Sequence, residues 1–276
     1  MELMRFVTGK KIQDILEKIG HQQLSLEDFY ALEEYFSFKH YKGRGTDQNP
    51  YEFIAPYTSF YPKTVTLSGM NTTKAYRDEQ HSEATIRRAQ RYIGGLLIYL
   101  WGKTNCGIIA RTNQNFYTPQ RIIGATEDVT RAKWFESQIN TIIYNKIHTN
   151  IDLRVSKSKS IEVAIGTNHD KHINPEYVNL IKKVLTDSGI TRISVNEKKL
   201  DASSETSLSA QLHNEIGLDT IQLSLSRELI LGPEKEENPD NMPVLTEEGF
   251  NNMLRLTGAM ENIVHEVNTL NLSLKR

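Results

Sequence analysis

The sequence predicts an α/β fold with a mixed or mainly parallel sheet of five or six strands and helices on both faces. From residue 63 onward, short runs rich in β-branched residues alternate with longer runs of helical periodicity. This alternation is typical of parallel strands joined by crossover helices. The chain has 276 residues, of which 38% are hydrophobic, so it can also bury a large core.

Each predicted strand is a short run of Ile, Leu, Val or Thr that a polar residue or glycine ends. The predicted strands are residues 63–67, 107–111, 161–165, 190–195 and 220–225, with a further extended stretch at 150–155. The last of them alternates strictly, with Gln222 and Ser224 between Ile221, Leu223 and Leu225. A central parallel strand is normally apolar on both faces. The alternation therefore favours an edge strand, with a pocket-lining strand as the alternative.

The predicted helices show apolar residues at a spacing of three and four. They cover two helices within the first 40 residues and then residues 82–101, 134–147, 174–189, 203–216 and a last helix from Thr246. The clearest helix has Asn174 as its N-cap, Pro175 in its first turn and Gly189 at its end. Ser25 with Asp28 three residues later indicates a second helix start.

The composition limits the domains and the partners. A polar break at residues 39–50 predicts a helical N-terminal extension over residues 1–45 and a single α/β domain over residues 46–276. The chain carries 33 Lys+Arg against 34 Asp+Glu, so we expect neither nucleic acid nor a membrane surface as a partner. Because the N-terminus lacks an apolar signal core, we expect a cytoplasmic protein. The single cysteine, Cys106, is expected to be a buried apolar residue.

Two stretches in the second half of the chain carry a family resemblance. Residues 161–167 and the run from His213 through Arg227 to Leu229 resemble the second half of N-formylglutamate amidohydrolases, whose fold is similar to that of zinc exopeptidases. The resemblance implies a zinc exopeptidase-like fold for residues 46–276. It also implies chemistry in which zinc polarises an amide carbonyl while a glutamate moves the proton.

The chain departs from the family at each position that serves this chemistry. A Pro-His pair is replaced by the run at residues 66–69, an Asp-x-His by Asp152-Leu153-Arg154, and a glutamate by Ser224. Arginine cannot bind zinc, and serine cannot carry the proton at neutral pH. We therefore expect a degenerate metal site without a cofactor, that is, a pseudoenzyme.

Several arginines follow the predicted strands or their turns, where ligands bind in open α/β sheets. Together with two serines they predict a positive pocket for a small anionic or glutamyl-like ligand, because guanidinium offers paired donors in one plane. The predicted ligand-binding residues are Ser68, Arg77, Arg111, Arg121, Arg154, Ser224 and Arg227.

Two other functions remain open. The first is an active metal-dependent amidohydrolase or carboxypeptidase that uses zinc on His81, Glu83 and another histidine, with His148, His169, His172 and His213 as the available histidines. The second is a protein-interaction module that uses the aromatic stretch 51–61 or the last helix. No phosphate loop, dinucleotide fingerprint or nucleophile elbow is present in the sequence. The sequence predicts no oligomeric state.

Overall fold

The fold was analysed in a computed structural model of the chain. The structure describes residues 14–15, 17–18, 24–25, 27–29, 32, 51–54, 64–70, 74–77, 84–87, 93–111, 142–143, 145–204, 208–231 and 247–274. No helix within these ranges is long and apolar enough to cross a bilayer.

The main sheet has seven strands in the order β1-β5-β2-β6-β9-β7-β8. Their bounds are β1 Tyr51–Ile54, β5 Gly107–Arg111, β2 Val65–Met70, β6 Thr149–Ser156, β9 Asp219–Ser226, β7 Val163–Gly166 and β8 Ile193–Val195. Strands β5, β2, β6 and β9 run parallel, whereas β1 and β7 are antiparallel to their neighbours β5 and β9. The predicted α/β class with a mixed sheet is confirmed, and the sheet has one strand more than the upper prediction.

Five helices are described, and most of them follow the predicted order. They are α3 Ile93–Thr104, α6 Pro175–Asp187, α7 Leu208–Ile216, α8 Arg227–Leu231 and α9 Glu247–Ser273. Asn174 caps α6 as predicted, because its side chain accepts from the backbone N–H of Glu176 at 2.9 Å. Gly189 ends this helix with a φ of +77°, a conformation that glycine adopts without strain.

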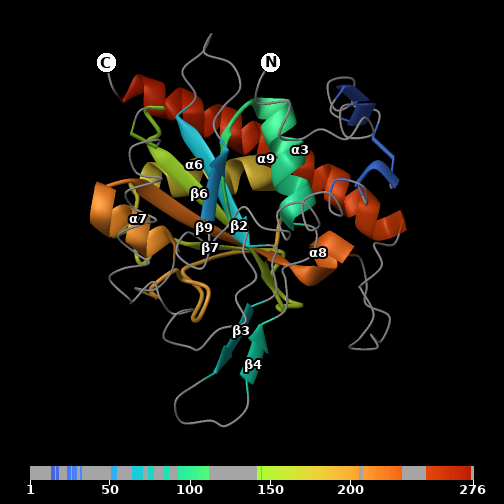
Figure 1. The fold of residues 1–276 in the computed structure, drawn as a ribbon, viewed down its shortest axis with the longest axis horizontal. Coiled ribbons are helices and arrows are strands. Elements are labelled where there is room, and N and C mark those ends of the chain that lie inside the picture. The colour runs from blue at the N-terminus through green and yellow to red at the C-terminus, as the bar shows by residue number, and fades with distance from the viewer. Residues whose placement is uncertain are drawn as a thin grey trace.

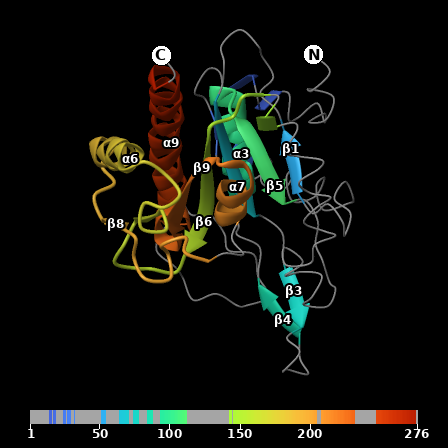
Figure 2. The same ribbon diagram turned by 90° about the vertical axis from the view of Figure 1, so that its left-hand side faces the viewer.

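Two sequence predictions about single elements are wrong. Residues 84–87 form strand β4 (Ala84–Arg87) instead of the start of a helix, and α3 begins only at Ile93. Strand β4 pairs with β3 (Lys74–Arg77) in a separate hairpin that projects from the main sheet (Figure 1 and Figure 2). Residues 51–54, for which the sequence predicts no strand, form the edge strand β1 against β5. The partner of β1 is distant in sequence, whereas that of β4 is the preceding strand β3, and helical periodicity reports neither.

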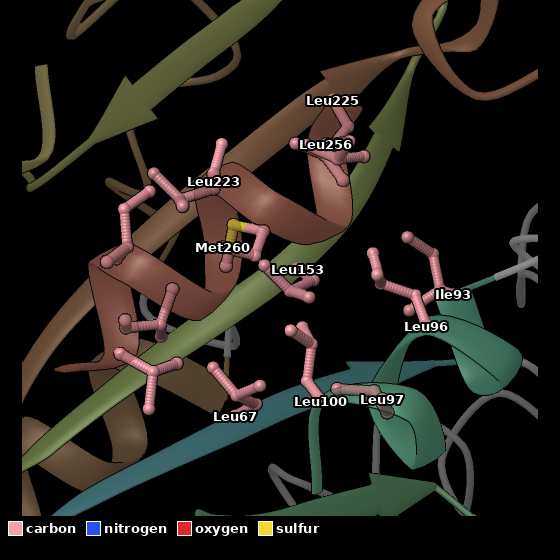
Figure 3. Close-up of a cluster of buried hydrophobic side chains, with 14 of the residues drawn as sticks. Leu67, Ile93, Leu96, Leu97, Leu100, Leu153, Leu223, Leu225, Leu256 and Met260 are labelled. Atoms are coloured by element: carbon pink, nitrogen blue, oxygen red, sulfur yellow. The ribbon is translucent and has the colours of Figure 1, made fainter. Parts of the chain in front are cut away.

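The largest core lies between the sheet and helices α3, α6, α8 and α9. Helix α9 runs beside α3 and α6 along this face (Figure 1). Figure 3 shows Leu153 and Leu223 from the strands among Leu256 and Met260 of α9 and Leu100 of α3. A second cluster on the opposite face joins Ile109 to Leu212 of α7, so helices cover both faces.

The described residues of the N-terminal segment pack on the same core. Ile15, Phe29 and Leu32 are fully buried members of the main cluster. The Ser25 hydroxyl accepts from the Asp28 N–H at 3.2 Å, and the Asp28 carboxylate accepts from the Ser25 N–H at 2.9 Å. This reciprocal pair confirms the predicted helix start. Burial raises the pKa of Asp28, but hydrogen bonds from Ser25 and Lys18 outweigh it and hold the pKa below its ordinary value. The boundary at residue 45 stays a prediction.

The C-terminal end of α9 is fixed to the sheet by a buried asparagine. Asn271 Oδ1 accepts from the hydroxyls of Tyr177 at 2.6 Å and Thr149 at 3.0 Å. Its Nδ2 donates to the hydroxyl of Thr64 at 2.8 Å. One side chain therefore satisfies polar groups on α6, β6 and the segment before β2.

We expect Asn271→Ala to lower the free energy of unfolding by about 3 kcal/mol, because two buried hydroxyls lose their acceptor and a small cavity opens. Urea unfolding measures this change. Asn262→Ala is the matched control, since Asn262 lies on the exposed side of the same helix and should change stability by less than about 0.5 kcal/mol. Equal losses in the two variants would contradict the role of Asn271.

Candidate functional site

One face of the sheet centre is polar but buried. In β2, β6 and β9 the side chains alternate, so apolar residues face α3 and α9 while polar residues face the other side. The register aligns Ser68 with Asp152 and Asp152 with Gln222. The buried polar residues of these three strands on this face are Thr66, Ser68, Asn150, Asp152, Ser156, Thr220, Gln222, Ser224 and Ser226. Because β9 lies between β6 and β7, the predicted edge position for this strand is wrong.

A continuous series of side-chain hydrogen bonds connects β2 to β6. Thr66 donates to Asn150 Oδ1 at 3.0 Å, and Asn150 Nδ2 donates to the Ser68 hydroxyl at 3.0 Å. Ser68 donates in turn to Asp152 Oδ1 at 2.9 Å. Each buried polar side chain in this series of hydrogen bonds has a partner, which is the condition for keeping such a network inside a protein.

This series of hydrogen bonds ends in an ion pair between Asp152 and Arg154. Arg154 Nε donates to Asp152 Oδ2 at 2.7 Å, so Asp152 uses one oxygen for Ser68 and the other for Arg154. The Asp152 side chain is only 3% exposed, whereas that of Arg154 is 32% exposed. The pair therefore buries a carboxylate and holds a guanidinium group at the border of the polar face.

A loop covers the β9 side of this face. Gln222 Nε2 donates to the Ser224 hydroxyl at 3.0 Å and contacts the carbonyl of Leu200 at 3.4 Å. A Cβ added to Gly166 would lie 2.9 Å from Ala202 N, closer than side chains approach backbone. The segment through Leu200 and Ala202 thus lies directly on β7 because residue 166 has no side chain.

The structure brings three of the predicted ligand-binding positions onto adjacent strands. Ser68 on β2 bonds to Asp152, and Arg154 on β6 is in register with Ser224 on β9. Ser68 and Ser224 are almost fully buried.

The other predicted arginines lie farther from this centre or outside the described residues. Arg227 follows β9 directly, and Arg111 ends β5 in register with Met70. Arg77 ends β3 in the separate hairpin. Arg121 lies outside the described ranges. The role of all these residues in ligand binding stays a prediction.

No three of the alternative metal ligands meet within the part of the chain that the structure describes. No group of three or more His, Cys, Asp or Glu suited to a metal occurs there. His169 is exposed in the loop after β7, 3.7 Å from Asp201, at the end of the sheet where β9 begins. His81 and Glu83 lie outside the described residues, so the zinc alternative stays a prediction.

The polar face does not fit the zinc ion that this fold implies. Of Ser68, Asp152, Arg154 and Ser224, only Asp152 is a usual zinc ligand, and both of its oxygens are already bonded. Arg154 adds a cation where a zinc site needs a neutral or negative donor.

The fold of the chain is similar to that of solved structures. No protein-family model and no curated protein matches the sequence. The structure is similar to the N-formylglutamate amidohydrolase of Ralstonia eutropha JMP134, with a TM-score of 0.52 and 12% identity over 79% of this chain and 98% of that one. The fold is that of N-formylglutamate amidohydrolases. This fold confirms the resemblance that the sequence predicts. The identity of 12% shows that the two sequences have diverged widely.

The similar structures also include peptidases. The Legionella pneumophila LapA aminopeptidase aligns with a TM-score of 0.47 and 8% identity, over 90% of this chain and 72% of that one. A metallo-carboxypeptidase from Burkholderia cenocepacia aligns with a TM-score of 0.44 and 9% identity, over 80% of this chain and 62% of that one.

The sequence predicts residues at the centre of the site, such as Arg154, but not all of the polar residues that surround them. It did not single out Thr66 or Asn150, although they build the polar face together with Gln222. The available signal was the alternation of polar and apolar residues over 149–154, the same pattern that stood out in β9. Two neighbouring strands with this pattern indicate a buried polar face between them.

Proposed function

We propose that the chain is a non-hydrolytic relative of N-formylglutamate amidohydrolases that binds a small anionic ligand of the glutamyl type. The observation that carries this proposal is the Asp152–Arg154 pair. The resemblance aligns these residues with an Asp-x-His motif that serves the metal, and here Arg154 donates to Asp152 at 2.7 Å.

The positive charge of Arg154 determines which ligand fits this site, because a cation favours a negatively charged ligand. Arg154 is fixed by its Nε bond while its side chain stays one-third exposed, which presents a planar cation at the edge of the polar face. Arg227 follows β9 directly. The guanidinium group of Arg154 at the border of the polar face favours an anion, and carboxylates match guanidinium in geometry.

Calorimetric titration with N-formyl-L-glutamate in the presence of a chelator tests the proposal. We expect binding that persists without metal, together with no hydrolysis of the amide bond. Arg154→Lys should weaken binding about tenfold or more, because lysine keeps the charge but loses the planar paired donors.

Two controls make the titration specific. Arg192→Lys changes a half-exposed arginine that pairs with Glu162 at 3.8 Å, and binding should be unchanged. Glutaramide, which lacks carboxylates, should not bind. Chelator-sensitive hydrolysis that His81→Ala abolishes would instead support the active zinc amidohydrolase, and unchanged binding in Arg154→Lys would contradict the cationic pocket.

A further inference from the structure

A buried histidine, His172, and a partly buried one, His213, lie together at the end of the sheet where β9 begins. His172 comes from the loop after β7 and His213 from α7, and their ring centres are 4.9 Å apart. Thr220 connects the two elements, because its N–H donates to His172 O at 2.9 Å and its hydroxyl to Ser209 O at 3.2 Å. Ser209 precedes His213 by one helical turn, so both residues lie on one side of α7.

Two polar atoms at this place lack a hydrogen-bond partner among the described residues. They are His172 Nδ1 and Ser209 Oγ, on side chains that are 3% and 1% exposed as residues. A buried polar atom without a partner costs about 1–3 kcal/mol. Such atoms in a native fold point to a bound water molecule or ion that satisfies them.

The other nitrogen of each ring is already hydrogen-bonded. His213 Nδ1 lies 3.1 Å from the Leu218 carbonyl, which only accepts, so Nδ1 carries the proton and Nε2 keeps its lone pair. His172 Nε2 lies 3.0 Å from Asn168 Nδ2, and an amide nitrogen only donates, so in this orientation Nε2 accepts. Turning the Asn168 amide by 180° lets Nε2 donate to Oδ1 and leaves Nδ1 with a lone pair, and metal binding requires this orientation. Histidines that bind metals have this arrangement, with one nitrogen on the metal and the other donating to a carbonyl.

We propose that His172 Nδ1 and His213 Nε2 bind a divalent transition metal ion such as Zn²⁺, with the Ser209 hydroxyl and solvent in the remaining positions. Imidazole is a good ligand for zinc, nickel and copper. Zinc–nitrogen bonds of about 2.1 Å, with ring centres about 1.2 Å behind the nitrogens, place two ring centres on a tetrahedral ion about 5.4 Å apart. The observed separation is 4.9 Å, so the two rings need to move apart only slightly to hold the ion.

The surrounding charges keep the imidazole of His172 neutral. Burial lowers the pKa of His172, and the nearby His213 and Lys171 lower it further. Asp219 is the acidic group that interacts with His213, and burial raises its own pKa. A histidine that resists protonation competes well for metal at neutral pH. This site includes neither Asp152 nor Arg154, so it is independent of the proposed ligand pocket.

Thermal unfolding of the chelator-treated full chain, with and without ZnCl₂ at pH 7.5, tests the site. We expect zinc at about one hundred times its dissociation constant to raise the melting temperature by roughly 5 °C. His172→Gln and His213→Gln should abolish the rise. His169→Gln is the matched control, because His169 lies in the same loop but is 64% exposed, and it should keep the full rise.

Calorimetric titration at pH 7.5 supplies the second readout, with one ion bound per chain. If His172→Gln does not fold, His213→Gln carries the comparison, because His213 is only partly buried. No rise in the unmodified protein would mean that water alone occupies the position and would overturn the proposal. A rise that survives both substitutions, or that His169→Gln removes, would overturn it as well.

Discussion

Arg154→Leu should lower the free energy of unfolding by about 3 kcal/mol, because it leaves the carboxylate of Asp152 buried without its counter-ion. The Asp152 side chain is 3% exposed, so water cannot replace the lost guanidinium group. Urea unfolding at neutral pH measures the loss.

A double-mutant cycle separates the ion pair from the packing of the arginine stem. Asp152→Asn combined with Arg154→Leu should recover a large part of the loss, because removing both charges leaves no unpaired ion. Arg192→Leu, at a half-exposed pair 3.8 Å from Glu162, should cost less than about 1 kcal/mol. Strictly additive effects at residues 152 and 154 would show that the two side chains do not act as a pair.

Gly166→Ala should destabilise the protein by about 3 kcal/mol. The new Cβ would meet the backbone of the covering loop, at 2.9 Å from both Ala202 N and Asp201 C and closer still to the Leu200 carbonyl. Backbone cannot rotate away as a side chain can, so the loop must move off the sheet and lose its contact with Gln222. Equilibrium unfolding gives the size of the effect, and faster proteolysis within residues 196–204 would report the displaced loop.

The control for this glycine lies in α9. Gly258 has no atom within 4 Å of an added Cβ and lies in the interior of the helix. Gly258→Ala should therefore stabilise the protein by about 0.5–1 kcal/mol through the unfolded state and helix propensity. An unchanged free energy of unfolding in Gly166→Ala would contradict the close contact between the loop and β7.

Local signals in the sequence were enough for most elements of the fold. Asn174, Pro175 and Gly189 defined α6 because capping and glycine conformation act over a few residues. The prediction failed where pairing with another strand decides the local structure. Ala84–Arg87 forms a strand because β3 is beside it, and Tyr51–Ile54 does so because β5 offers an open edge.

The candidate site could be predicted only in part, for a similar reason. That Asp152 and Arg154 share a face follows from the period of a strand. That Ser68 bonds to Asp152, and that Ser224 lies in register with Arg154, depends on the strand order, which alternation alone does not determine. For this reason the polar residues of β9 suggested an edge although they line a buried face.

The Asp152–Arg154 pair is the centre of this account, and anomalous diffraction at the zinc edge, from crystals grown with zinc, tests it most directly. We predict no anomalous peak within bonding distance of the Asp152 carboxylate, with Arg154 Nε still donating to it; a peak beside His172 and His213 is compatible with this result. A zinc peak on Asp152, with Arg154 turned away, would contradict the account.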